Sequence, residues 1–138
     1  MTEAQLQEQV AHYIRLQYPN AMFHSDFGSG IKLTMGQAAK QKRQNGGRRA
    51  WPDMFIAEPK TKFYGPERKV INHNGMFLEL KKEGVRVTKK DGTYVSNAHI
   101  LEQAHVLHEL RDRGYIAEFA VGFEEARKWI DWYLGGKE

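Results

Sequence analysis

The sequence predicts an α/β (α+β) domain with a central mixed β-sheet flanked by helices. Apolar side chains recur at helical spacing in separate stretches, near both ends of the chain and before its last strand. Short apolar segments after Pro52, at 76–82 and at 115–122 have the length and composition of buried strands. Because these helices and strands alternate along 138 residues, one layered domain over 1–138 is expected.

The first third of the chain predicts two helices with a strand between them. A helix over 2–18 begins at the cap Thr2 and ends at the turn-forming "YPN". Residues 21–33 predict a strand and a turn. A short basic helix over 34–45 begins at Thr34, and the following Gly-Gly pair ends it.

The middle of the chain predicts strands separated by polar segments. Pro52 is tolerated at the start of a strand, where its missing N–H lies outside the ladder. Residues 58–75 contain Gly-Pro and Asn-Gly turn signals and predict a hairpin before the strand at 76–82. Residues 84–97 alternate around Asp-Gly, which fits either a β-hairpin or a flexible loop.

The last third predicts a helix, a strand and a closing helix. The helix over 98–113 has Asn97 as its cap and Gly114 as its stop, and the strand at 115–122 follows. The closing helix at 123–134 carries two glutamates in its first turn, where the helix dipole favours acidic residues.

The composition narrows the class of protein. There is no cysteine, no apolar run near the ~20 residues of a membrane span, and no signal-peptide pattern at the start. We therefore expect a cytoplasmic protein without a membrane role. The net charge is only +4, but no acidic residue lies between Asp26 and Asp53, where the chain carries Lys32, Lys40, Lys42, Arg43, Arg48 and Arg49. Such a cluster fits a polyanion such as nucleic acid, or else a solvated basic face.

A possible catalytic group links two of the strands. Glu79 and Lys81 are two residues apart on a strand and project from one face, and Asp53 lies beside them if the strands pair. Carboxylates are ligands for Mg²⁺, which can activate water for attack on a phosphodiester. A lysine can position that water, or else neutralise the transition state. The alternative is that Glu79 and Lys81 form the solvent face of an edge strand.

Two further residues are candidates for the same site. Gln103 falls on the helix face directed at the sheet, where it would bond the site, or else it lies at the rim and bonds a loop. On the first helix Glu3 lies on the apolar stripe and Glu8 does not, so Glu3 is the better candidate for an extra acidic ligand. A solvated acid favoured by the helix dipole is the alternative for Glu3.

Several stretches together resemble the VRR-NUC family of the PD-(D/E)XK, restriction-endonuclease-like superfamily. They are "TEAQLQEQV", "GGRRAWPDMFI", "GMFLELKKEG" and "ILEQAHVLHELRDRGYIAEFAVGFEEARKWIDWYL". The resemblance covers most of the chain. The segments 58–75 and 84–97 are longer than the family pattern, and Ala50-Trp51 replaces a smaller pair before Pro-Asp.

The resemblance implies a Mg²⁺- or Mn²⁺-dependent DNA endonuclease, often acting on branched, flap or junction DNA in replication, repair or recombination, and often a homodimer. By motif match, the catalytic positions fall on Asp53, Glu79 and Lys81, with Gln103 and Glu3 in support. The metal ligands would be Asp53, Glu79 and Glu3. Lys40, Lys42, Arg43, Arg48 and Arg49 are the expected nucleic-acid-binding residues.

Two other functions stay open at this stage. The first is a non-catalytic nucleic-acid-binding module on the same fold, and the second is an RNA-directed nuclease. A zinc site at His105 and His108 would need further ligands, which only His99 or distant residues supply, so surface histidines are the expected reading.

Overall fold

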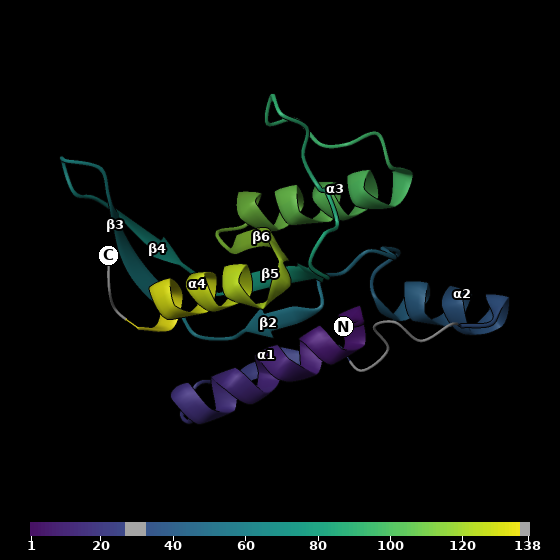
Figure 1. Cartoon of the computed structure of the whole chain (residues 1–138), viewed down its shortest axis with the longest axis horizontal. Coiled ribbons are helices and arrows are strands. Elements are labelled where there is room, and N and C mark those ends of the chain that lie inside the picture. The colour runs from purple at the N-terminus through teal and green to yellow at the C-terminus, as the bar shows by residue number, and fades with distance from the viewer. Residues whose placement is uncertain (27–32, 136–138) are drawn as a thin grey trace.

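A four-stranded mixed sheet forms the centre of the molecule, in the order β1-β2-β5-β6 (Figure 1). The computed structural model describes residues 1–26 and 33–135. The strands are β1 (Phe23–Ser25), β2 (Met54–Ile56), β5 (Met76–Lys81) and β6 (Ile116–Val121). The pairs β1–β2 and β2–β5 are antiparallel, and β5–β6 is parallel. The predicted fold class is confirmed.

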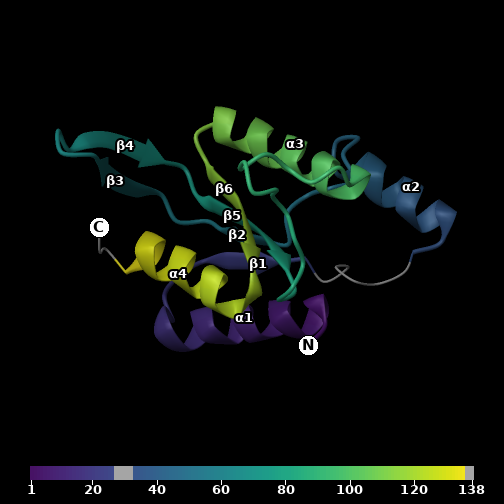
Figure 2. The same cartoon turned by 45° about the horizontal axis from the view of Figure 1, so that its top comes forward.

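Helices cover both faces of this sheet (Figure 2). The helices α1 (Glu3–Gln17) and α4 (Gly122–Leu134) enclose one apolar cluster, and α3 (Ala98–Asp112) encloses another. Because both faces are covered, all six residues of β5 are buried. Leu78 and Leu80 belong to the α1–α4 cluster and Phe77 to the α3 cluster, so the alternation of the strand directs Glu79 and Lys81 toward α3.

Local signals set the ends of the helices where the sequence predicts them. Thr2 and Thr34 each form a capping box with the residue three positions on, and Asn97 accepts from two amides at the start of α3. After α3, Gly114 has φ 89°, which favours glycine. At Gly75 a Cβ would lie 2.8 Å from the Ile56 carbonyl oxygen, so only glycine lets β2 approach the start of β5.

The two longer segments differ in structure. Residues 58–75 contain a hairpin of β3 (Lys60–Tyr64) and β4 (Lys69–His73), as predicted, which projects at the end of α4 (Figure 1). Residues 84–97 form a loop in which an antiparallel bridge joins Thr88 and Tyr94. Two backbone hydrogen bonds flank the bridge, from the Lys89 amide to the Thr93 carbonyl oxygen and from the Val95 amide to the Val87 carbonyl oxygen. The segment is therefore a loop with short hairpin-like pairing around Asp-Gly, so each of the two alternatives holds in part. The bridge joins the two halves of the loop, and Tyr94 packs edge-on against Phe119 of β6.

The hairpin β3–β4 reverses the usual positions of its polar and apolar side chains. Lys62 is buried, and its Nζ donates to the Trp132 carbonyl near the end of α4 and lies over the Trp132 ring. Phe63 and Val70 pair across the hairpin and are exposed. The lysine therefore attaches the hairpin to the carbonyl end of α4, which the helix dipole makes favourable for a cation.

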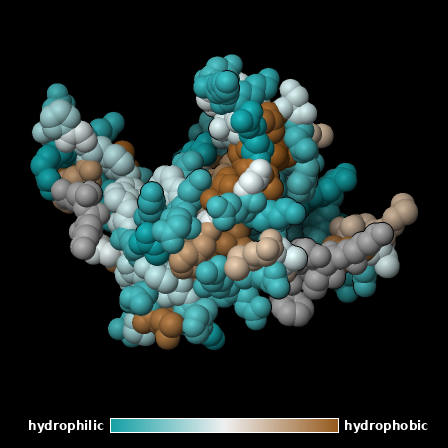
Figure 3. Space-filling view, in the orientation of Figure 1, coloured by the Kyte–Doolittle hydropathy of each residue, from teal (hydrophilic) through white to brown (hydrophobic). Residues whose placement is uncertain are grey.

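The remaining helix, α2 (Met35–Gln44), lies apart from these layers and has no buried residue. Hydrophilic residues make up much of the face shown in Figure 3. None of the helices in the described residues is long and apolar enough to cross a membrane. The predicted turn after β1 and Lys32 fall in 27–32, outside the described residues.

Candidate active site

Asp53 and Glu79 meet where β2 begins and β5 approaches its end. The register pairs Met54 with Leu78, so one step further along the same ladder Asp53 lies opposite Glu79. The Asp53 amide donates to Glu79 Oε2 at 3.1 Å, and the Leu80 amide donates to Asp53 Oδ2 at 2.8 Å. The strand pairing that the sequence analysis required for this site is confirmed.

Glu79 is a buried carboxyl group, 4% exposed. Burial raises its pKa well above the ordinary value, the negative charge of Asp53 raises it further, and the positive charge of Lys81 opposes the shift. The electrostatic cost of ionising Glu79 beside Asp53 falls if a cation is bound between or beside the two carboxylates. The pair therefore favours positive charge at this end of the sheet.

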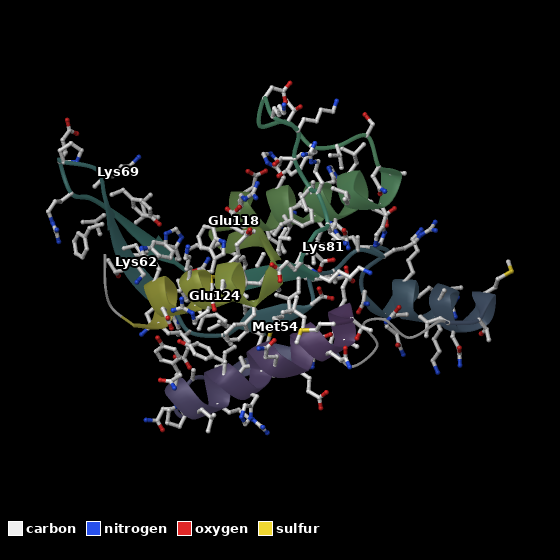
Figure 4. The ribbon with its side chains drawn as sticks, in the orientation of Figure 1. Met54, Lys62, Lys69, Lys81, Glu118 and Glu124 are labelled. Carbon is white, nitrogen blue, oxygen red and sulfur yellow. The ribbon has the colours of Figure 1, made fainter. Side chains whose placement is uncertain are left out.

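Lys81 supplies one positive charge from the same strand. It is 5% exposed, and β5 is a central strand with β2 on one side and β6 on the other. The alternative in which Glu79 and Lys81 form the solvent face of an edge strand is therefore wrong. Figure 4 shows Lys81 at the end of the sheet that is nearer to α2.

Gln103 reaches this site from α3. It is 5% exposed, and its Nε2 donates to Glu79 Oε1. The alternative of a rim position bonded to a loop is wrong. Within the described residues, Gln103 Oε1 is a buried side-chain oxygen without a hydrogen-bond partner. Such an oxygen is costly to bury unless water or a ligand donates to it.

Gln7 is a residue of this region that the sequence analysis missed. It is buried in α1, and its Nε2 donates to Ser25 Oγ at 2.6 Å and to the carbonyl oxygens of Asp26 at 2.8 Å and Asp53 at 3.4 Å. It thus connects α1, the end of β1 and the backbone of Asp53. The sequence does contain a signal for the burial of Gln7, because at about 100° per residue Gln7 falls beside Ile14 on the apolar stripe of α1.

The acidic candidates on α1 lie in different environments. Glu3 is half-buried and one helical turn before Gln7, whereas Glu8 is exposed. Among the described residues, however, no three acidic or histidine side chains form a group that could hold a metal ion. The structure therefore brings Asp53 and Glu79 together without Glu3, and a ligand role for Glu3 stays a prediction.

The basic residues between Thr34 and Pro52 do not act as one uniform patch. Lys40, Arg43 and Arg49 are exposed and Lys42 is half-buried. Arg48 is engaged with Glu109 of α3, with 2.6 Å between Arg48 Nη2 and Glu109 Oε2. This hydrogen bond raises the pKa of Arg48 and lowers that of Glu109. Arg48 therefore fastens the segment before β2 to α3.

The histidines of α3 and the aromatic side chains of α4 have structural roles. His105 and His108 are exposed and lie within 4 Å of Glu109 and Asp112, respectively, as expected of surface histidines. Trp129 and Trp132 pack against the α1–α4 cluster, and Tyr133 is fully buried in it. These aromatic side chains therefore contribute to the core.

Comparison with known proteins identifies a solved structure of the same fold. No family model and no curated protein matches the sequence. A solved structure named "VRR_NUC domain protein" matches with a TM-score of 0.63 and 21% sequence identity, over 98% of this chain and 89% of that one. The chain therefore has the fold of that VRR_NUC domain protein.

Proposed function

We propose that this protein is a divalent-metal-dependent nuclease that hydrolyses phosphodiester bonds in DNA. The observation that carries the proposal is the convergence of Asp53, Glu79 and Lys81, from paired strands, at one end of the sheet. The fold shared with a VRR_NUC domain protein supports a nuclease, as its name indicates. The resemblance in the sequence motifs around Asp53, Glu79 and Gln103 supports it independently.

The residues of the site fit Mg²⁺ or Mn²⁺ as the cofactor. Asp53 and Glu79 would hold the ion, and two carboxylates suffice for Mg²⁺, which keeps several waters and also binds substrate phosphate. A hydrated cation would lower the raised pKa of Glu79, and one of its waters would donate a hydrogen bond to Gln103 Oε1. The bound ion would supply an acidified water and neutralise charge on the phosphate. Glu3 is proposed as an outer ligand.

The protein's own groups would then have distinct tasks. The Lys81 ammonium group donates to a non-bridging phosphate oxygen and stabilises the negative charge that develops as water attacks phosphorus. Gln103 donates to Glu79 through Nε2, and its Oε1 can accept a hydrogen bond from a water molecule. One P–O bond forms to the water oxygen while the bond to one sugar oxygen breaks. The attacking water gives up a proton to solvent, and the departing sugar oxygen takes up a proton from solvent.

The substrate is proposed to be branched, flap or junction DNA, and the protein to act as a homodimer. A two-fold dimer would place two sites on the two strands of a symmetric junction. RNA cleavage, or binding of nucleic acid without cleavage, are the competing functions.

A cleavage panel tests the proposal. Junction, flap, linear duplex and single-stranded DNA and duplex RNA are incubated with Mg²⁺, Mn²⁺ or EDTA. We expect metal-dependent cleavage of DNA, with branched DNA preferred, which Asp53→Asn and Lys81→Met abolish. Lys128→Met, which changes an exposed lysine on α4, is the matched control and keeps activity. Binding without cleavage under every condition would contradict a nuclease, and preferred cleavage of RNA would reassign the substrate.

A further inference from the structure

The helix α2 packs no side chain into the hydrophobic core. None of its ten residues is buried. In both orientations it lies beyond the end of the sheet where β2 begins and β5 ends, which is the end that carries the candidate active site (Figures 1 and 2). Helices in proteins are stabilised mainly by packing an apolar face. The sequence of α2 therefore reflects something other than the core.

Although α2 covers no core, it is fastened at its carboxyl end. The Trp51 Nε1–H group donates to the Asn45 carbonyl oxygen at 2.9 Å, and the Gly47 amide donates to the Lys42 carbonyl oxygen at 2.8 Å. The ion pair of Arg48 with Glu109 joins the same segment to α3. These contacts hold the end of α2 next to the strand that carries Asp53.

One face of α2 is turned away from the rest of the molecule. Gln41 and Lys42 are the half-buried residues of the helix, so at about 100° per residue the opposite face is centred on Gly36. We call this the outer face of α2. It consists of two small and two basic residues, all exposed: Gly36, Ala39, Lys40 and Arg43.

Gly36 is not required by its own surroundings. Its φ is not positive, and a Cβ built on it would meet no atom of the described residues within 4 Å. Glycine is nevertheless one of the least favourable residues in a helix. A residue without a side chain, beside Ala39 and between two cations, permits close approach of a ligand to the helix backbone.

The charge of the outer face selects the kind of partner. No acidic residue occurs from 27 to 52, so the face presents positive charge alone. A second copy of this chain, docked through the same face, would bring Lys40 and Arg43 against their own counterparts. A polyanion has the complementary charge.

We infer that the outer face of α2 enters the major groove of duplex DNA, so that α2 selects double-stranded DNA for the neighbouring active site. The inference rests on the proposed function. A helix fits the major groove, which is about 12 Å wide, whereas the major groove of duplex RNA is too narrow for side chains to read. Single strands are held mainly by stacking on aromatic rings, and α2 itself contains none. The ring of Trp51, beyond its carboxyl end, is engaged with the Asn45 carbonyl oxygen and with Phe77.

Binding measurements in EDTA test the charge on this face. Anisotropy of a labelled 20-base-pair DNA duplex is measured from 50 to 300 mM salt for the wild type and for Lys40→Gln/Arg43→Gln. We expect the salt slope of log K to fall by about 1.8, because each phosphate contact contributes roughly 0.9. The control Lys69→Gln/Lys128→Gln removes the same charge from exposed positions on the hairpin and α4 (Lys69 is labelled in Figure 4) and keeps the slope.

A second pair of variants tests close approach without changing charge. Gly36→Leu is expected to weaken duplex DNA binding about tenfold, the cost of ~1.4 kcal/mol. Ala38→Leu adds bulk to the other side of α2, at another exposed position, and is expected to leave binding unchanged. Circular dichroism and thermal unfolding establish that each variant is folded, and sedimentation establishes its oligomeric state.

Any one of four results would overturn the inference. These are an unchanged salt slope in Lys40→Gln/Arg43→Gln, equal losses for single-stranded DNA or duplex RNA, equal effects of Gly36→Leu and Ala38→Leu, and a changed oligomeric state in the outer-face variants. The proposed function is tested separately, through cleavage of bis(p-nitrophenyl) phosphate, a substrate too small to reach α2. If the outer-face variants cleave it and bind duplex DNA as the wild type does, α2 has no such role and the nuclease assignment stands. If the wild type binds duplex DNA through α2 but hydrolyses nothing, the nuclease assignment fails alone.

Discussion

Asp53 and Glu79 are braced against each other through the backbone of two paired strands. The Asp53 amide donates to the Glu79 carboxylate at 3.1 Å, and the amide that follows Glu79, that of Leu80, donates to the Asp53 carboxylate at 2.8 Å. Glu79 lies within β5 and Asp53 immediately before β2, so each carboxylate is held by a backbone amide of the paired segment. Placement of this kind is what a preorganised site requires.

The buried carboxyl group of Glu79 predicts an unusual dependence of stability on pH. Its pKa is raised above 4.5 by burial and by Asp53. The folded state therefore retains a proton that the unfolded state releases, so the contribution of Glu79 to stability is fully present below pH 4.5 and is lost as pH rises through the folded pKa. Urea unfolding in EDTA from pH 4.5 to 8 should show the wild type losing stability relative to Glu79→Gln. Added Mg²⁺ should restore the wild type alone, and parallel curves for the two proteins would contradict the assignment.

Substitution of Gln7 should destabilise the protein from outside the catalytic group. Gln7→Ala removes hydrogen bonds to Ser25 and to the carbonyl oxygens of Asp26 and Asp53. Loss of this donor to three partly buried oxygens should lower the free energy of unfolding by about 1–3 kcal/mol. Gln9→Ala, at an exposed position on the same helix, is the matched control and should have little effect in urea unfolding. Equal midpoints for the two variants would show that Gln7 does not connect these elements.

The two acidic residues of α1 should differ in their effect on cleavage. Glu3 is half-buried on the side of Gln7, and Glu8 is exposed. If Glu3 acts as an outer ligand, Glu3→Gln should reduce the cleavage rate at limiting Mg²⁺ by roughly tenfold, with partial recovery at saturating Mg²⁺. Glu8→Gln should retain the wild-type rate. The same metal dependence in both variants would remove Glu3 from the site.

Asp131 should govern stability at acidic pH. It accepts from Tyr13 Oη at 2.6 Å, Tyr18 Oη at 2.7 Å and Arg127 Nη1 at 3.1 Å, which joins α1 to α4. Burial raises its pKa, but these hydrogen bonds outweigh burial and lower the pKa below 3.8. Its contribution is therefore present above pH 3.8 and is lost as pH falls through the folded pKa.

Acid unfolding followed by circular dichroism measures this contribution. Asp131→Asn should be less stable than the wild type at pH 6, and the difference should shrink as the pH approaches 2. Glu8→Gln, which alters an exposed acid on α1 outside this network, should follow the wild type closely. A stability difference for Asp131→Asn that stays constant with pH would contradict this account.

Much of the fold was predictable because its signals are local. Thr2, Thr34 and Asn97 cap helices through neighbouring amides, and Gly114 ends α3 with a positive φ. The period of a strand placed Glu79 and Lys81 on one face, and helical spacing placed Gln103 on the side of its helix directed at the sheet. The pairing of the strand after Pro52 with that of Glu79 was only a condition for Asp53 to join them, and the structure meets it.

What the sequence could not supply depends on contacts between distant segments. The burial of Lys62 beside the exposed Phe63 depends on where the end of α4 lies. The pairing of Arg48 with Glu109 removes one arginine from a run that appears uniform in the sequence. The separation of Glu3 from Asp53 and Glu79 likewise depends on how α1 crosses the sheet.

The most direct test of the central claim is the rate at which the purified protein nicks supercoiled DNA in Mg²⁺. The account predicts metal-dependent nicking by the wild type and by Lys128→Met. It predicts a loss of roughly 100-fold or more in Asp53→Asn, because the carboxylate that orients the reacting groups is gone. Nicking by Asp53→Asn at the wild-type rate, or no nicking by the folded wild type, would contradict it.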